Sequence, residues 1–174
     1  MQKWQFEMKL YHGTNCHIDI IDLSKCRPYK DFGKGFYLTE LEQQAREWAL
    51  RISENFGNKP KIIEYEYIPN SIPDLNILAF EKPCLEWAYF IMNNRNRNLQ
   101  EAFGKLDNRN CQYDIVEGPV GNDDIAVTLN QFIQGLISDD LLVEKLKYKK
   151  LNHQMSFHTE KSLTILTKTG EYDL

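Results

Sequence analysis

Residues 27–48 read RPYKDFGKGFYLTELEQQAREW, a loop with two glycines, a short apolar run and the start of a helical pattern. Gly33 and Gly35 flank a lysine, so the backbone there can adopt positive φ angles or lie against a flat ligand without an intervening Cβ. The next three residues predict a short strand. Thr39 and Glu42 have the spacing of a capping box, which predicts a helix with Thr39 as its N-cap. Taken by itself, this segment is typical of an ordinary β-turn-β-α connection.

The predicted helix continues to Gly57, a residue suited to ending a helix. Its apolar residues recur at helical spacing and form one helical stripe, made of Leu41, Ala45, Trp48, Ala49, Ile52 and Phe56.

The composition is that of one globular domain. The chain has 174 residues, 42% of them hydrophobic and 26% charged, which suits a single domain over residues 1–174. A net charge of -4 gives no global basic field toward nucleic acid, and no apolar run is long enough to cross a bilayer. No signal peptide is recognisable, and the four cysteines are scattered without a Cys-x-x-Cys pair. We therefore expect a cytoplasmic protein with reduced thiols, no membrane partner and no nucleic-acid ligand.

The remaining patterns predict extended and helical segments without regular βαβ alternation. Extended runs are expected at residues 8–11, 61–68, 74–80, 113–119, 153–159 and 163–168. Helices are expected at residues 83–93, 125–136 and 138–150, with a polar loop over residues 93–98. This order favours an α+β domain over a doubly wound sheet.

Metal and phosphate-loop chemistry have little support. His12 and His17 are five residues apart, as are His153 and His158, and neither spacing matches a zinc motif. The loop around Gly33 lacks the patterns of phosphate-binding loops, so no metal site and no loop of that type are expected.

Three segments stand in an informative order. Residues 10–14 read LYHGT, residues 32–38 read FGKGFYL, and a strand near the end opens with QMSF at Gln154. This order resembles the ADP-ribosyltransferase superfamily, in its diphtheria-toxin and poly(ADP-ribose)-polymerase-like branch, whose motifs carry a His, a Tyr and a Glu. The whole chain is similar to a bacterial group of that superfamily catalogued only as a domain of unknown function (number 3990).

The resemblance implies a fold and a site. The fold would be two split antiparallel β-sheets that enclose an NAD cleft, with flanking helices. His12 would hydrogen-bond the adenosine ribose, and Gly13 and Thr14 would hold the nicotinamide amide. Tyr37 would stack on the nicotinamide ring, a flat cation that an aromatic face attracts by ~0.5–2 kcal/mol.

Gln154 departs from the family pattern because it stands at the position of the catalytic glutamate. A glutamine keeps hydrogen-bond geometry toward a ribose hydroxyl, but it has no charge to stabilise the oxocarbenium-like centre formed when nicotinamide leaves, a loss on the order of 10²–10³ in rate. Glu117 and Glu160 are other carboxylates that could approach the site. Arg27 and Gly35 belong to the loop expected beside the dinucleotide, where Arg27 either contacts the pyrophosphate or braces the loop.

The resemblance implies an NAD-dependent mono-ADP-ribosyltransferase of the glycosyltransferase class, toxin-like, that transfers ADP-ribose from NAD to a macromolecular acceptor. Protein is the expected acceptor, and a small neutralising partner of antitoxin type is also implied. Two alternatives stay open: an NAD glycohydrolase, in which water is the acceptor, and a non-catalytic NAD-binding module with a degenerate third motif. His12 and Tyr37 also have purely structural interpretations, as a satisfied strand-end histidine and a core tyrosine.

Overall fold

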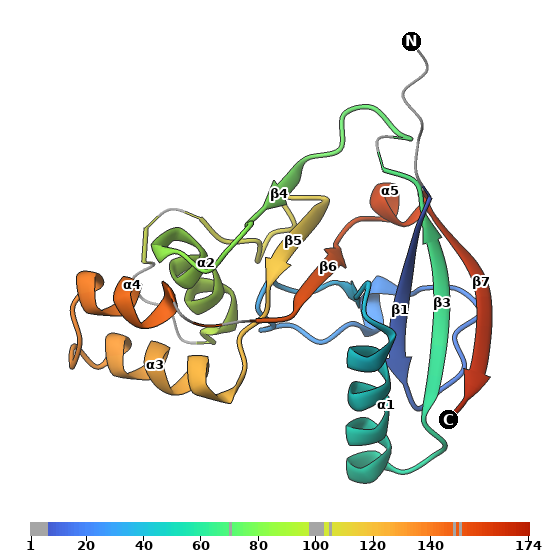
Figure 1. Cartoon of the computed structure of the whole chain (residues 1–174). Helices are drawn as coiled ribbons and strands as arrows, with labels where there is room; N and C mark the ends of the chain where they lie inside the picture. The colour runs from blue at the N-terminus through green and yellow to red at the C-terminus, as the bar shows by residue number, and fades with distance from the viewer. Residues whose placement is uncertain (1–6, 70, 98–102, 105, 148, 150) are drawn as a thin grey trace.

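The computed structural model describes residues 7–69, 71–97, 103–104, 106–147, 149 and 151–174. Within them the chain forms two open β-sheets and five α-helices, so the predicted α+β class is confirmed. The two sheets lie side by side, and helices lie beside the first sheet and at the far end of the second (Figure 1).

The first sheet has three strands in the order β1 (Met8–Thr14), β3 (Lys61–Tyr67) and β7 (Leu166–Asp173), and it is antiparallel throughout. Helix α1 (Glu42–Phe56) packs on one face, where Ala45 and Ala49 are buried with Ile62. A Cβ at Gly13 would lie 2.0 Å from the carbonyl oxygen of Ala45. Glycine is therefore required at this position for α1 to pack closely on β1.

The second sheet has four strands in the order β2 (Phe36–Leu38), β6 (His153–Phe157), β5 (Ile115–Pro119) and β4 (Ile77–Ala79). The expectation of antiparallel pairing throughout is wrong for one pair, because β4 and β5 run parallel. The chain between them passes through helix α2 (Leu85–Arg95), and parallel neighbours require a crossover of this kind.

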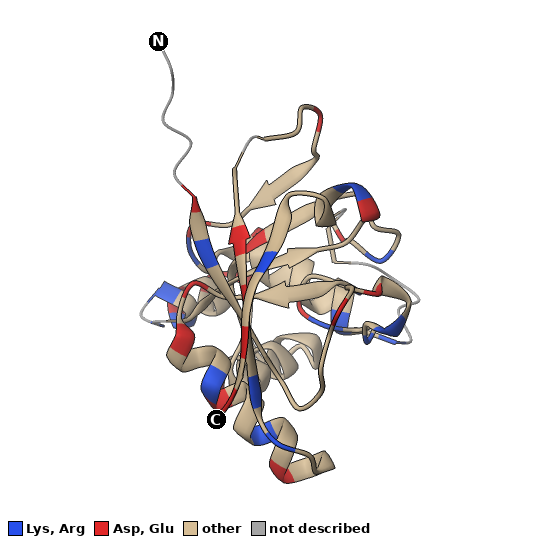
Figure 2. Ribbon diagram, turned by 90° about the vertical axis from the view of Figure 1, so that its right-hand side faces the viewer, with Lys and Arg blue, Asp and Glu red and all other residues tan. Residues whose placement is uncertain are grey.

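Helices α2, α3 (Asp123–Ile133) and α4 (Asp139–Lys147) form a helical layer at the end of the second sheet (Figure 1). Their core includes Trp87, Phe90, Ile125, Leu129 and Leu142. A single helical turn, α5 (Glu160–Leu163), precedes β7. No helix among the described residues has the length and apolar character needed to cross a membrane. Lysines and arginines are interspersed with acidic residues along the ribbon in the view of Figure 2.

The polar loop expected from residue 93 begins later than predicted. Asn93 and Asn94 belong to α2 and are fully buried. Asn93 Nδ2 donates to the carbonyl oxygens of Phe103 and Leu106 at 2.6 and 2.9 Å, and Asn94 Oδ1 accepts from the amide of Asn108 at 2.8 Å. The side-chain amides of Asn93 and Asn94 thus form hydrogen bonds with backbone groups of a loop that is distant in sequence. These bonds permit the burial of both polar side chains.

The two sheets meet where β1 and β2 touch. Tyr11 and Thr39 exchange two backbone hydrogen bonds, of 2.8 and 3.0 Å. The predicted capping box is wrong, because Leu41 is the N-cap of α1 and Thr39 Oγ1 accepts from the Leu41 amide instead. Gly57 ends α1 with φ of +78°, as predicted. The bridge brings the ends of the first two sequence motifs next to each other.

Candidate functional site

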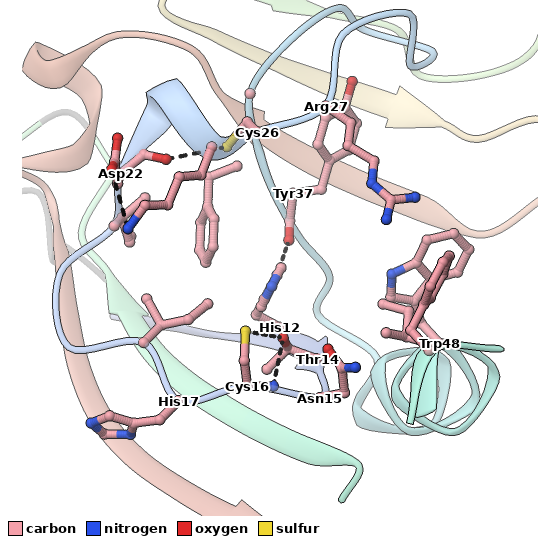
Figure 3. A pocket seen from close by; sticks show the side chains of 18 of the residues that line it. His12, Thr14, Asn15, Cys16, His17, Asp22, Cys26, Arg27, Tyr37 and Trp48 are labelled. Carbon is pink, nitrogen blue, oxygen red and sulfur yellow. Dashed lines mark hydrogen bonds and ion pairs between the residues drawn. The ribbon is translucent and has the colours of Figure 1, made fainter. Parts of the chain in front are cut away.

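A cleft of about 870 Å³ lies beside the junction of β1 and β2. Its walls are the end of β1, the loop that follows it, the segment of residues 25–30, strand β2 and one face of α1 (Figure 3). Six of the seven residues predicted to form the site line it: His12, Gly13, Thr14, Arg27, Gly35 and Tyr37. This volume is within the range of pockets that hold a cofactor-sized ligand.

His12 links the first two motifs. Its Nδ1 lies 2.8 Å from the main-chain carbonyl oxygen of Tyr37, and a dashed line in Figure 3 marks this contact. Because a carbonyl can only accept, Nδ1 carries the proton. Burial, with a smaller contribution from the nearby Lys30 ammonium, lowers the pKa of His12 to about 4, against the opposing effect of the hydrogen bond to the Tyr37 carbonyl. The ring is thus neutral at pH 7, which leaves Nε2 as a hydrogen-bond acceptor.

The ring of His12 is also fixed by stacking on Phe36, with ring centroids 4.3 Å apart. Thr14, two residues along the strand, lies on the same face of β1 as His12. Its hydroxyl accepts from the amide of Cys16 at 3.3 Å and thereby shapes the turn that follows β1.

Tyr37 closes the glycine-rich loop with its hydroxyl. The Tyr37 hydroxyl accepts from the amide of Phe32 at 2.9 Å and donates to the carbonyl of Gly33 at 2.8 Å. Burial raises the pKa of Tyr37 well above its ordinary value, so the hydroxyl remains a donor. The hydroxyl of Tyr37 thus has a structural role, while its ring lines the cleft.

The two glycines of the loop serve different purposes. Gly33 has φ of +93°, a conformation that other residues rarely adopt. At Gly35 a Cβ would lie 2.5 Å from Nδ1 of His158, so this glycine permits a close approach. His158 Nδ1 donates to the carbonyl of Lys34 at 2.8 Å, and its Nε2 lies 2.7 Å from Ser156 Oγ. This buried histidine therefore holds the loop from behind.

Helix α1 supplies a wall that the sequence analysis did not assign to the site. Only Ala45 and Ala49 of its predicted stripe are buried, whereas Trp48 and Phe56 are 44% and 62% exposed. The helix face toward the cleft carries Trp48, Arg51, Ile52, Asn55 and Phe56. This face mixes aromatic, cationic and amide side chains at helical spacing, which indicates ligand contact. A pattern that counts only apolar residues does not reveal this mixture.

Three cations line the cleft without an ion-pair partner among the described residues, and each lies over an aromatic ring. The guanidinium carbon of Arg27 is 5.1 Å from the ring centroid of Phe56, and that of Arg51 is 6.0 Å from the ring of Trp48. The third is Lys30, whose Nζ is 4.7 Å from the ring of Tyr37. Both acids of the cleft are engaged, Asp22 by Ser24 and Lys25 and Asp19 by His17. The cleft therefore suits an anionic ligand.

Gln154 lies outside this cleft. It lines a hollow of about 30 Å³ together with Glu40, Glu117, His153 and Met155. Tyr37 pairs with Ser156, two residues further along β6, so Gln154 and Tyr37 share one face of the second sheet. Of the two alternative carboxylates, Glu117 lies beside Gln154, whereas Glu160 lies in α5 and lines neither space.

The described residues contain no group of three or more His, Cys, Asp or Glu side chains that could hold a metal ion.

The chain is an α+β protein with a ligand-sized cleft beside the junction of two open sheets. It belongs to a family of proteins of unknown function, DUF3990, whose family model matches residues 8–167. Comparisons with curated proteins and with solved structures found no match.

Proposed function

We propose that this protein is a mono-ADP-ribosyltransferase with the ADP-ribosyltransferase fold, which transfers ADP-ribose from NAD to a protein acceptor. One observation carries the proposal: the His12 and Tyr37 motifs, 25 residues apart in sequence, are joined by a hydrogen bond at one cleft large enough for a dinucleotide. A structural role for either residue alone would not require both to line the same cleft.

The chemistry of the cleft suits the parts of NAD. The neutral ring of His12 offers Nε2 as an acceptor for a ribose hydroxyl. The ring of Tyr37, with Trp48 on the opposing helix, offers aromatic surface to the cationic nicotinamide. Arg27 and Arg51 lack an ion-pair partner among the described residues, so both are available to the pyrophosphate.

Catalysis in this proposal depends on positioning. Cleavage of the nicotinamide–ribose bond creates positive charge on the sugar, and an enzyme that holds the sugar in a strained pose lowers this barrier. Gln154 lies on the sheet face that carries Tyr37 and would orient a ribose hydroxyl without supplying charge. A modest rate follows, which suits transfer of one unit to a protein better than synthesis of a chain. The proposal extends to a toxin-like role with a small neutralising protein partner.

One observation favours a second candidate, a non-catalytic NAD-binding module. Among the described residues no glutamate lines the cleft, and Gln154 faces a separate small hollow. A cleft that binds NAD without a carboxylate at the sugar would hold the dinucleotide intact or hydrolyse it slowly. An NAD glycohydrolase differs from both in using water as the acceptor.

Incubation with NAD labelled in its adenylate part distinguishes these functions. A transferase labels a protein of a cell lysate and releases nicotinamide, and a glycohydrolase releases nicotinamide and free ADP-ribose without labelling. A binding module does neither but binds NAD saturably. Labelling that is equal in wild type, H12A and Y37A would contradict the proposed site.

A further inference from the structure

Lys30 occupies a distinctive place in the cleft. Its Nζ lies 4.7 Å from the ring centroid of Tyr37 and 5.9 Å from that of Trp48. The two rings come from different walls, β2 and α1, and both line the cleft together with Lys30. The ammonium therefore lies near two aromatic rings at once, in the arrangement by which aromatic cages hold organic cations.

The surroundings of Lys30 set the balance between the cost of burying its ammonium and its contacts with the aromatic rings. The side chain is half-buried, and among the described residues no carboxylate pairs with its ammonium. Burial lowers the pKa of Lys30, and Arg27 lowers it further. The neighbouring Asp31 is engaged elsewhere, because it accepts from Arg95 Nε at 2.7 Å and from the amide of Gly121 at 2.8 Å. The two cation–π contacts thus offset part of the cost of burying this charge.

We propose that Lys30 is a built-in competitor for the aromatic site of the cleft: its ammonium fills the space between Tyr37 and Trp48 when the cleft is empty and must leave before a cationic ring can enter. The inference rests on the proposed function, because that function places a pyridinium at this site. Lys30 then sets the affinity of the cleft for a cationic ring and keeps other small cations out.

A different reading assigns Lys30 to the phosphates of the ligand, as a third cation beside Arg27 and Arg51. The two interpretations predict different effects of removing the Lys30 ammonium. Removing a competitor tightens the binding of a cationic ring, whereas removing a phosphate ligand weakens the binding of NAD. The position of Nζ over the rings, at a distance typical of cation–π contact, favours the first.

The test uses 1-methylnicotinamide, a permanently cationic pyridinium without phosphates, and follows quenching of tryptophan fluorescence. In K30M the side chain keeps its apolar stem and loses its charge. We expect K30M to bind 1-methylnicotinamide roughly 3- to 30-fold more tightly than wild type, the range that one cation–π contact provides. K30R keeps a cation and should resemble wild type.

Two matched variants complete the design. Lys34 lies in the same loop but does not line the cleft, so K34M should leave the affinity unchanged. Adding W48L to K30M should abolish the gain, because the second ring is lost. Titration calorimetry measures this variant, since W48L also removes the cleft tryptophan whose fluorescence reports binding.

The outcomes separate the inference from the proposed function. If K30M binds the pyridinium no better than wild type, or if no variant binds it, Lys30 is not a competitor. If K30M binds NAD more weakly while its affinity for 1-methylnicotinamide is unchanged, Lys30 is a phosphate ligand and the inference is overturned. Tighter pyridinium binding by K30M together with no NAD binding by any variant would support the role of Lys30 and contradict the proposed function.

Discussion

The imidazole of His12 donates a 2.8 Å hydrogen bond from Nδ1 to the main-chain carbonyl of Tyr37. This bond joins the end of β1, in one sheet, to β2, in the other. It orients Nε2 of His12 as an acceptor and holds the backbone of Tyr37 in place at the same time. The two motifs therefore act as one unit, and substitutions can separate the structural part from the binding part.

The two nitrogens of His12 are expected to have separable roles. In H12N the side-chain amide can replace Nδ1 as the donor to Tyr37, but nothing replaces Nε2. We expect H12N to unfold at nearly the wild-type temperature and to bind NAD roughly 2- to 10-fold more weakly, the worth of one hydrogen bond. H12A should unfold at a lower temperature than wild type and should also bind NAD more weakly. Thermal unfolding and titration calorimetry measure the two effects. Wild-type affinity of H12N for NAD would show that His12 does not hydrogen-bond the ribose.

Tyr37 allows a similar separation. Y37F removes a hydroxyl that bonds the amide of Phe32 and the carbonyl of Gly33, so the free energy of unfolding should fall by about 1–2 kcal/mol. Its ring remains, and NAD affinity should change little. Y37L removes the ring, and affinity should fall roughly 3- to 30-fold. Denaturant unfolding and calorimetry test the pair. Equal affinities of Y37F and Y37L would show that the ring does not stack on the ligand.

Acid should destabilise the fold through His158. Burial lowers its pKa to about 4 from the ordinary value of 6.5, so between these values the unfolded chain binds the proton and the folded protein does not. The free energy of unfolding should therefore fall as pH decreases from 6.5 to 4, by up to about 3 kcal/mol from this group, and level off below pH 4.

A comparison of H158N with H153N isolates this contribution. His153 is exposed and H153N serves as the matched control, so H158N should show a smaller slope of unfolding free energy against pH than H153N. His12 adds to the slope in both variants. His17 acts in the opposite direction in both, because Glu171 and Asp19 raise its pKa. Equal slopes in the two variants would mean that the pKa of His158 is not lowered in the folded protein.

Gln154 is expected to affect turnover more than NAD binding. Q154A should reduce the rate of nicotinamide release while leaving the Kd for NAD nearly unchanged. Q154E restores a carboxylate and should raise the rate by on the order of 10–10²-fold. Because Glu117 and Glu40 line the same hollow, the gain should be larger at higher pH, where the added acid is ionised. Chromatographic detection of nicotinamide measures the rate of its release by both variants. Rates equal to that of wild type would show that Gln154 does not take part in catalysis.

The sequence predicted the elements that follow from local pattern. The α+β class, the strands around His12 and Tyr37 and the end of α1 at Gly57 are all present. The orientation of α1 was harder to predict. Its stripe mixes small and large apolar residues, and only Gly13, which brings the helix backbone against β1, explains why the alanines face the sheet while Trp48 faces the cleft.

Other features depend on contacts between distant segments. The burial of Asn94 requires hydrogen bonds to Asn108 and to the carbonyl of Asp31. The polar run in the sequence around Asn94 does not predict these distant partners. The position of Lys30 near two rings likewise requires β2 and α1 to be placed first. Side chains that unite remote segments are thus the part that pattern analysis misses.

Calorimetric titration of NAD into the wild-type protein and Y37L tests the NAD cleft most directly. We predict saturable binding of one NAD per chain to the wild type and a loss of affinity of roughly 3- to 30-fold in Y37L. No heat of binding to the folded wild-type protein, or equal affinity for the two proteins, would contradict an NAD site formed by His12 and Tyr37.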